Sequence, residues 1–242
     1  MQRAYYASTI TEFLTETENS ILGELTKHHQ FALEDLQRNA WIGQNRFLKQ
    51  QLHELDGYIA FEYAIPRMGK RVDVILLFKG VVFVVEFKVG SSSYTRDAID
   101  QVIDYSLDLK NFHEESHQRA IVPILIATGA KRNDEFSCAA FDDNVYLPNK
   151  TNGSNLLDLL FQYVQCIGES QIDFQIWQNS RYKPTPTIIE AAQALYRGHD
   201  VKEISRSDSG AINLSRTSEK ISQIIVQAKQ ESKKVICFVT GV

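Results

Sequence analysis

Hydrophobic residues along this chain follow two kinds of pattern, a helical repeat and uninterrupted runs. Through residues 33–55 apolar side chains return every three or four positions, which predicts a long amphipathic helix. Other stretches are apolar almost without interruption, as in strands that are covered on both faces. The predicted strands are 58–64, 71–78, 81–88, 121–127, 144–147 and 174–177, and further helices are predicted at 9–29 (two short ones), 97–112 and 155–166. Pro123 favours an edge position or an irregularity for its strand. The pattern predicts an α/β fold with a helical N-terminal extension.

The character of the chain changes after Tyr182. Two prolines interrupt residues 183–187, and Pro186 is well placed in the first turn of a helix that runs to about residue 197. A polar linker is predicted at 198–216, followed by a helix at 217–230 and a terminal strand. We therefore expect two parts, 1–182 and 183–242.

Lys79 and Gly80 separate two runs of β-branched and apolar residues, which predicts an antiparallel hairpin. An even-length loop centred on this pair makes the numbers of opposed residues sum to 159, so Asp73 would lie opposite Glu86. Side chains alternate along a strand, and Lys88 therefore projects from the same face as Glu86. A three-residue loop would instead send Asp73 to the opposite face.

Two carboxylates and one ammonium would thus meet on a buried sheet. Opposed side chains lie about 5 Å apart, and two carboxylates at that distance repel by roughly 3 kcal/mol at an effective dielectric constant near 20. Mg²⁺ or Mn²⁺ would relieve this repulsion, polarise a phosphate and lower the pKa of a bound water. The pattern favours metal-dependent phosphodiester cleavage, with Asp73 and Glu86 as ligands and Lys88 as a fixed positive charge. The alternative is a polar plug in which Lys88 merely pairs with an acid.

Asp73 together with Glu86-Phe87-Lys88 resembles the D…(D/E)-x-K signature of the PD-(D/E)XK nuclease superfamily. The core of that superfamily is a small mixed sheet flanked by helices. The resemblance implies that Asp73 and Glu86 bind the metal, that the Phe87 carbonyl is a further ligand, and that Lys88 is catalytic.

Gln101 and Tyr105 are similar to the Gln-x-x-x-Tyr element that follows the lysine in RecB-type members of the superfamily. Positions i and i+4 share a helix face, so both side chains can support one site. Many members carry another Glu on an N-terminal helix. The candidates here are Glu54 and Glu62, and neither matches the pattern closely, which leaves one or two metal ions open.

Three further segments are similar to the N-terminal region of bacterial Schlafen-group-3-like DNA/RNA helicase proteins, in which a nuclease-like domain precedes a P-loop helicase. These segments are Tyr5–Leu14, Gln37–Trp41 and Ile65–Asp73. Residues 234–242 have the form of a strand that enters the first Gly of a G-x-x-x-x-G-K-[ST] loop. The alternative is an ordinary C-terminal strand. The phosphate-binding Lys is not included, so we expect no ATP binding by this chain and a helicase domain as its partner in the full-length protein.

The formal net charge of −4 and a pI near 5.9 argue against nucleic-acid binding through bulk positive charge. Local phosphate contacts are expected instead, and each candidate could equally be a solvated side chain. The candidates are Arg67, Lys70, Arg71 and Arg96. The three cysteines form no C-x-x-C pair and no even framework, which indicates a reducing cytosol and no zinc ribbon. No apolar run approaches the roughly 18 residues of a membrane span, so we expect a cytoplasmic protein without membrane contact.

Residues His113 to His117 match H-E-x-x-H, the zinc-binding motif of helical metalloproteases. The match falls at the end of its predicted helix, and no third ligand is evident. The alternative is a polar helix end, where a protonated His113 would complement the helix dipole.

Two functions are therefore expected from the sequence. The first is a metal-dependent nuclease that cleaves DNA, or less readily RNA. The second is a catalytically weak nucleic-acid-binding module that serves a helicase.

Overall fold

The computed structural model describes residues 3–27, 35–53, 55–65, 70–133, 135–141, 143–182, 212–231 and 233–237. The chain divides into two compact units, Met1–Tyr182 and Lys183–Val242, and the boundary falls where the composition of the sequence changes. Several predicted features lie outside the described residues: the helix after Pro186, residues 238–242 of the predicted terminal strand, Arg67 and Glu54.

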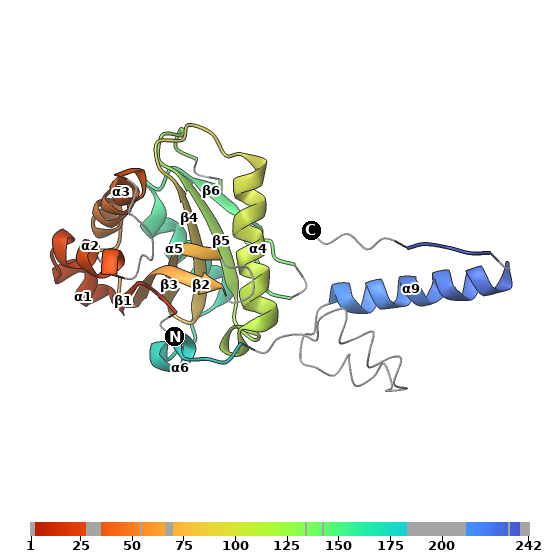
Figure 1. Ribbon diagram of the computed structural model, residues 1–242. Coiled ribbons are helices and arrows are strands. Elements are labelled where there is room, and N and C mark those ends of the chain that lie inside the picture. Colours follow the sequence, from red (N-terminus) through yellow and green to blue (C-terminus); the bar gives the residue numbers. More distant parts are fainter. Residues whose placement is uncertain are drawn as a thin grey trace. The chain divides into compact units, whose positions relative to one another are not determined.

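A six-stranded mixed sheet forms the centre of the N-terminal unit (Figure 1), with its strands in chain order. The strands are β1 (Tyr6–Thr9), β2 (Tyr58–Ile65), β3 (Lys70–Phe78), β4 (Val81–Lys88), β5 (Ile121–Ala127) and β6 (Asn149–Thr151). Neighbouring strands from β1 to β4 are antiparallel, whereas β5 and β6 join in parallel. The predicted α/β class is confirmed.

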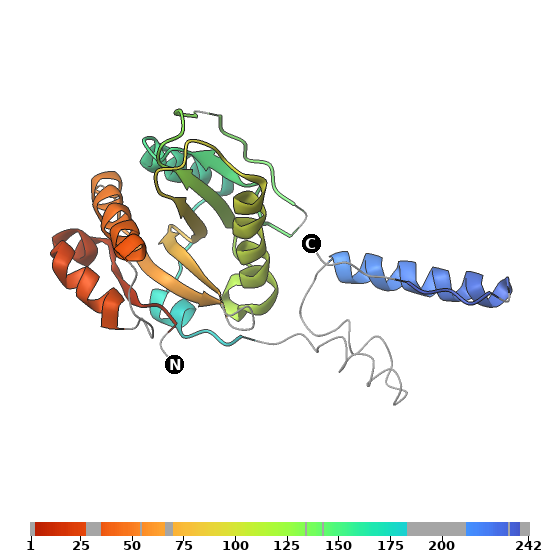
Figure 2. The same ribbon diagram turned by 45° about the horizontal axis from the view of Figure 1, so that its top comes forward.

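Helices cover both faces of this sheet (Figures 1 and 2). One apolar cluster lies between the sheet and α1, α2, α3 and α5, and a second lies between the sheet, α4 and α6. The helices are α1 (Ile10–Thr15), α2 (Glu18–Lys27), α3 (Asp35–Gln51), α4 (Arg96–Phe112), α5 (Leu156–Ile167) and α6 (Phe174–Gln178). The predicted N-terminal helices are therefore present, and they belong to the main core.

The hairpin between β3 and β4 has the predicted register. Its pairs run from Val74 with Val85 to Phe78 with Val81, and every pair sums to 159. Lys79 and Gly80 both have positive φ, 47° and 83°, as in a type I′ turn, whose twist matches that of the strands. A Cβ at residue 80 would lie 1.9 Å from the Ser170 side chain, so this position requires glycine.

The strand predicted at 174–177 is wrong, because these residues form α6. Asp173 caps the helix: its side chain accepts a hydrogen bond from the Ile176 N–H. Phe174 and Trp177, three positions apart, are both buried on one helix face. A short apolar segment fits either period, and here the cap and the packing of the two rings decide for the helix.

The last strands of the sheet also differ from the prediction. Residues 144–147 contribute only isolated bridges at Val145 and Tyr146, and the sixth strand is instead β6, Asn149–Thr151. The strand β1 was not predicted from the sequence. Of the two alternatives for Pro123, the edge position is wrong because β5 lies inside the sheet. The irregularity fits, because β6 pairs with β5 only from Ile124 onward, beyond the proline.

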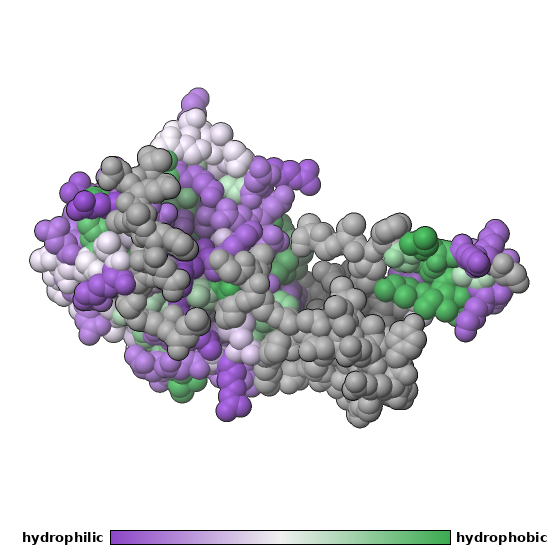
Figure 3. All heavy atoms as spheres, in the orientation of Figure 1, coloured by the Kyte–Doolittle hydropathy of each residue, from purple (hydrophilic) through white to green (hydrophobic). Residues whose placement is uncertain are grey.

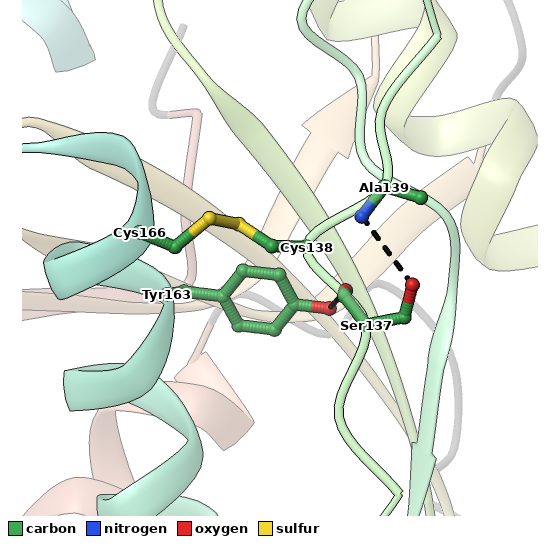
Figure 4. The surroundings of a disulfide bond; sticks show 5 residues. All are labelled: Ser137, Cys138, Ala139, Tyr163 and Cys166. Carbon is green, nitrogen blue, oxygen red and sulfur yellow. Dashed lines mark hydrogen bonds between the residues drawn. A yellow bond between two sulfur atoms is a disulfide. The ribbon is translucent and has the colours of Figure 1, made fainter.

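Cys138 and Cys166 form a disulfide that joins the segment after β5 to the end of α5 (Figure 4). Beside it, the Tyr163 hydroxyl donates to the Ser137 carbonyl at 3.2 Å. The cysteine spacing did not predict this pair, because the fold brings together two residues that are 28 positions apart. Cys237 is free and exposed.

The C-terminal unit contains α9, Ile212–Gln230, which begins inside the stretch predicted as a linker. Residues 233–237 are not in a strand, so the described part of the predicted terminal strand is wrong. Apolar side chains are exposed on this unit (Figure 3), among them Ile225, Val226, Val235 and Ile236. Within the described part of the chain, no helix has the length and hydrophobicity needed to cross a membrane.

Candidate functional site

Acidic side chains occupy one row across three neighbouring strands. The pairs on either side place Glu62 of β2 level with Asp73 of β3, and the hairpin register, continued by one residue, places Asp73 level with Glu86 of β4. Glu62 and Glu86 are 8% and 3% exposed, and Asp73 is half-buried. The hairpin therefore brings together the two carboxylates that the sequence singled out, and β2 adds a third.

The backbone is irregular in this row. Glu62 has a φ of 51°, a left-handed conformation that is uncommon for a residue with a side chain. The neighbouring residues consequently face opposite ways: Phe61 belongs to the core beneath α3, and Tyr63 to the core beneath α4. The Glu62 side chain accepts a hydrogen bond from the Trp41 indole at 2.7 Å, which ties it to α3.

Lys88 joins the acidic row to α4. Its ammonium donates to Glu86 Oε1 at 3.0 Å and to Gln101 Oε1 at 3.1 Å. Gln101 in turn donates to the Tyr105 hydroxyl at 2.9 Å. The predicted i, i+4 pair thus lies on the face that contacts the lysine, and the chain of bonds fixes the position of the ammonium.

Burial and mutual repulsion act on the two central carboxylates. Loss of hydration raises the pKa of Asp73 well above its ordinary value, and the nearby Glu86 raises it further. Burial also raises the pKa of Glu86, although the Lys88 ammonium partly opposes the rise. Asp73 accepts one hydrogen bond, from the Phe87 N–H at 2.8 Å. Glu86 Oε2 is buried and accepts no hydrogen bond from the described residues.

These groups line a pocket of about 610 Å³, which we call the acid–lysine pocket. Its walls are α3, the loop after β4, and the residues Glu62, Asp73, Glu86, Phe87 and Lys88. Another pocket, of about 670 Å³, surrounds Gly80, Arg119 and Gly168 and contains none of the predicted site residues. The acid–lysine pocket is therefore the candidate site.

The donor set of this pocket suits a hard divalent cation. Asp73 and Glu86 provide carboxylate oxygens, and Glu86 Oε2 accepts no hydrogen bond from the described residues. Burial raises the pKa of both carboxyls, and a bound cation would stabilise their charged forms. In the described residues, no group of three or more His, Cys, Asp or Glu is arranged to hold a metal ion. Glu62, held by Trp41, does not complete such a group. A bound ion would depend on the two carboxylates, backbone oxygen and water.

The predicted phosphate contacts do not gather at this pocket. Arg71 donates to the Glu62 carbonyl at 2.7 Å and stacks over the Tyr5 ring, so it supports the irregular backbone of β2. Lys70 is exposed at the start of β3. Arg96 is exposed and pairs with Asp100 at 3.7 Å in the first turn of α4. The structure brings none of these three side chains together.

The H-E-x-x-H match is not a helical pair of histidines. His113 caps the end of α4, and a separate 3₁₀ turn, Glu114–Ser116, precedes His117. His113 is fully buried, and burial lowers its pKa to about 3, so the ring is neutral. The interpretation as a polar helix end with a protonated histidine is therefore wrong. Zinc-ligand geometry is also absent among the described residues.

The sequence interpretation missed the part of the site that comes from α3. Gln37, Trp41 and Gln44 line the acid–lysine pocket and lie on one helix face, at i, i+4 and i+7. That spacing is visible in the sequence, but two glutamines and a tryptophan do not by themselves indicate a site.

Comparisons with known proteins leave the family open. No protein-family model matches the chain, and a search of curated proteins gives no match. Among solved structures, the chain is similar to the crystal structure of protein VC1899 from Vibrio cholerae, with a TM-score of 0.31 and 14% identity. The match covers 63% of this chain and 44% of that protein, so the chain spans less than half of its length.

Proposed function

We propose that the N-terminal unit is a metal-dependent nuclease of the PD-(D/E)XK type that hydrolyses phosphodiester bonds in DNA, and less readily in RNA. The observation that carries the proposal is the grouping of one buried and one half-buried carboxylate with a lysine in one pocket. Asp73 and Glu86 have raised pKa values, and no residue that the structure describes donates a hydrogen bond to Glu86 Oε2. Gln101 holds Lys88 beside these carboxylates.

In this proposal Asp73 and Glu86 hold Mg²⁺ or Mn²⁺, with the Phe87 carbonyl as a further candidate ligand. The ion, when bound, polarises the phosphate and lowers the pKa of a water. Lys88 stabilises the negative charge that develops on the phosphate oxygens during attack, since it carries a positive charge that is already in position. Gln101 and Tyr105 orient that ammonium.

A cleavage assay tests this proposal. End-labelled single-stranded DNA, double-stranded DNA and RNA are incubated with the purified protein in Mg²⁺, Mn²⁺ or EDTA. We expect cleavage of DNA in either metal and none in EDTA. Intact polymers under all of these conditions would contradict a nuclease.

A catalytically weak nucleic-acid-binding module is the second candidate. The observation that favours it is Glu62, which is held by Trp41 and completes no three-carboxylate group. Such a module would bind nucleic acid in EDTA as strongly as in Mg²⁺. On the sequence resemblance alone, we also propose that either activity serves a P-loop helicase domain in the full-length protein.

The raised pKa of Asp73 predicts how stability depends on pH and metal. The folded state favours protonated Asp73, so this contribution is complete below the unfolded pKa of about 3.9 and is lost as the pH rises through the folded pKa. Asp73→Asn keeps the acceptor for the Phe87 N–H and removes the charge. At pH 7 without metal we expect Asp73→Asn to be more stable than the wild type by about 1 kcal/mol, or about 2–4 °C in the melting temperature.

Thermal unfolding between pH 4.5 and 8 measures this effect. In EDTA the wild type should lose stability relative to Asp73→Asn as the pH rises, and Mn²⁺ should restore the wild type alone. Asp56→Asn, at an exposed aspartate, is the control and should follow the wild type. Equal stabilisation of Asp73→Asn and the wild type by Mn²⁺ would show that Asp73 is not a ligand.

A further inference from the structure

Gln44 is a buried amide in the α3 wall of the acid–lysine pocket. The residue is 5% exposed. Two other pocket residues on the same face of α3 already have a partner in the acidic row: Trp41 and Gln37 both donate to Glu62 Oε1, at 2.7 and 3.3 Å. Gln44 therefore lies one helical turn beyond two residues that both bind Glu62.

The Gln44 carbonyl oxygen, unlike the side-chain N–H groups of Gln37 and Trp41, has no hydrogen-bond partner among the described residues. Oε1 is buried and accepts no hydrogen bond from any residue that the structure describes. Buried polar side chains are nearly always hydrogen-bonded, so an unpaired amide oxygen on a residue that lines a pocket is a candidate to accept a hydrogen bond from a ligand.

The chemistry of the missing partner is restricted. An amide oxygen needs a hydrogen-bond donor, and ionised carboxylates such as those of the acidic row can only accept. Phosphate oxygens are also acceptors. The donors of a nucleic acid are the N–H groups of the bases and, in RNA, the ribose 2′-hydroxyl.

We propose that Gln44 is a substrate-binding residue whose Oε1 accepts a hydrogen bond from an N–H or O–H donor of the nucleotide beside the scissile phosphate. This inference deepens the proposed nuclease function and rests on it. Gln44 contributes to the binding of the nucleotide, whereas Lys88 acts on the phosphate.

The neighbouring residue provides a matched control. Asn45 is also a buried amide of α3, 2% exposed, and its Oδ1 likewise accepts no hydrogen bond from the described residues. Asn45 lines a separate cavity of about 90 Å³ between α2 and α3 and is not among the residues of the acid–lysine pocket. A purely structural effect of a buried amide should therefore be common to both residues, and an effect on substrate should be confined to Gln44.

The experiment compares Gln44→Met and Asn45→Leu with the wild type. Methionine keeps the length of the side chain and removes the amide. For Gln44→Met we expect KM to rise about tenfold with kcat within about twofold, which is the effect of losing one hydrogen bond to the substrate. Asn45→Leu should leave KM unchanged, and calorimetry should give the same Mn²⁺ affinity for all three proteins.

Two further comparisons of KM identify the group of the nucleotide that donates the hydrogen bond to Gln44. A rise in KM on RNA but not on DNA would assign it to the 2′-hydroxyl. A rise on both polymers that disappears with an abasic nucleotide next to the cleaved bond would assign it to a base. An unchanged KM, an equal rise in Asn45→Leu, or a fall in Mn²⁺ affinity for Gln44→Met would each overturn the inference.

Binding measurements separate this inference from the proposed function. Gln44→Met is added to Lys88→Ala, and the affinity of both proteins for labelled DNA and RNA is measured by fluorescence anisotropy in Ca²⁺. A tenfold loss of affinity without cleavage by the wild type would support the role of Gln44 while contradicting the nuclease. Cleavage by the wild type with equal affinities here would contradict Gln44 alone, and a wild type that neither cuts nor binds would contradict both.

Discussion

Replacing Lys88 by alanine is expected to lower the rate of nucleic-acid cleavage by roughly 10²- to 10⁴-fold, as for other groups that stabilise charge in a transition state. The ammonium lies 3.0 Å from Glu86 Oε1 and is held by Gln101, so its charge is already in place before the substrate binds. The measurement is single-turnover cleavage of DNA at saturating Mg²⁺. Lys88→Arg keeps the charge and should retain part of the rate.

Stability distinguishes this role from the polar plug. The Lys88 side chain is 35% exposed, and an ion pair with that access to water contributes little to folding. Lys88→Ala should therefore unfold within a few degrees of the wild type, as should Lys150→Ala, a control at an exposed lysine of β6. A large loss of stability in Lys88→Ala together with an unchanged cleavage rate would support the plug and contradict the catalytic role.

The largest effect on stability is expected for His113→Ala, a loss of about 4 kcal/mol in the free energy of unfolding. His113 is fully buried, and its Nδ1 lies 2.7 Å from the Ser116 hydroxyl. The ring also packs against Trp177 with a centroid distance of 4.5 Å. The substitution would leave a cavity and remove a partner of Ser116. Urea unfolding measures the loss.

His53→Ala, at an exposed histidine after α3, is the control and should stay within about 0.5 kcal/mol of the wild type. The cleavage rate per folded molecule of His113→Ala should be unchanged, since His113 is not among the residues that line the acid–lysine pocket. If the wild type had a zinc-dependent peptidase activity and an equally stable His113→Ala lacked it, the metalloprotease interpretation would be supported instead.

The centre of the candidate site could be predicted from local sequence patterns. The strand period and the Lys79-Gly80 turn were sufficient to predict the hairpin and its register, because a two-residue turn with two positive φ angles allows one pairing. That register, with the alternation of side chains, predicts the neighbourhood of Asp73, Glu86 and Lys88. The contact of Gln101 with Lys88 was not visible in this way; it was suggested by the resemblance and is present in the structure.

Other features depended on contacts between residues far apart in the chain. Glu62 is fixed by Trp41, which is 21 positions away, and Gln44 becomes a candidate only because α3 forms a wall of the pocket. The burial of His113 depends on Trp177, and the disulfide joins residues 28 positions apart.

The α/β class, most helices and strands, and the hairpin that contains the acids and the lysine could be predicted from the sequence alone. These are properties of short segments, where periodicity and turn chemistry act between near neighbours. Four features follow only from the three-dimensional fold: the burial of the two rings of α6, the position of the last strand, the irregular backbone at Glu62 and the amide wall of α3. Their physical cause is packing and hydrogen bonding across the core, which no local pattern contains.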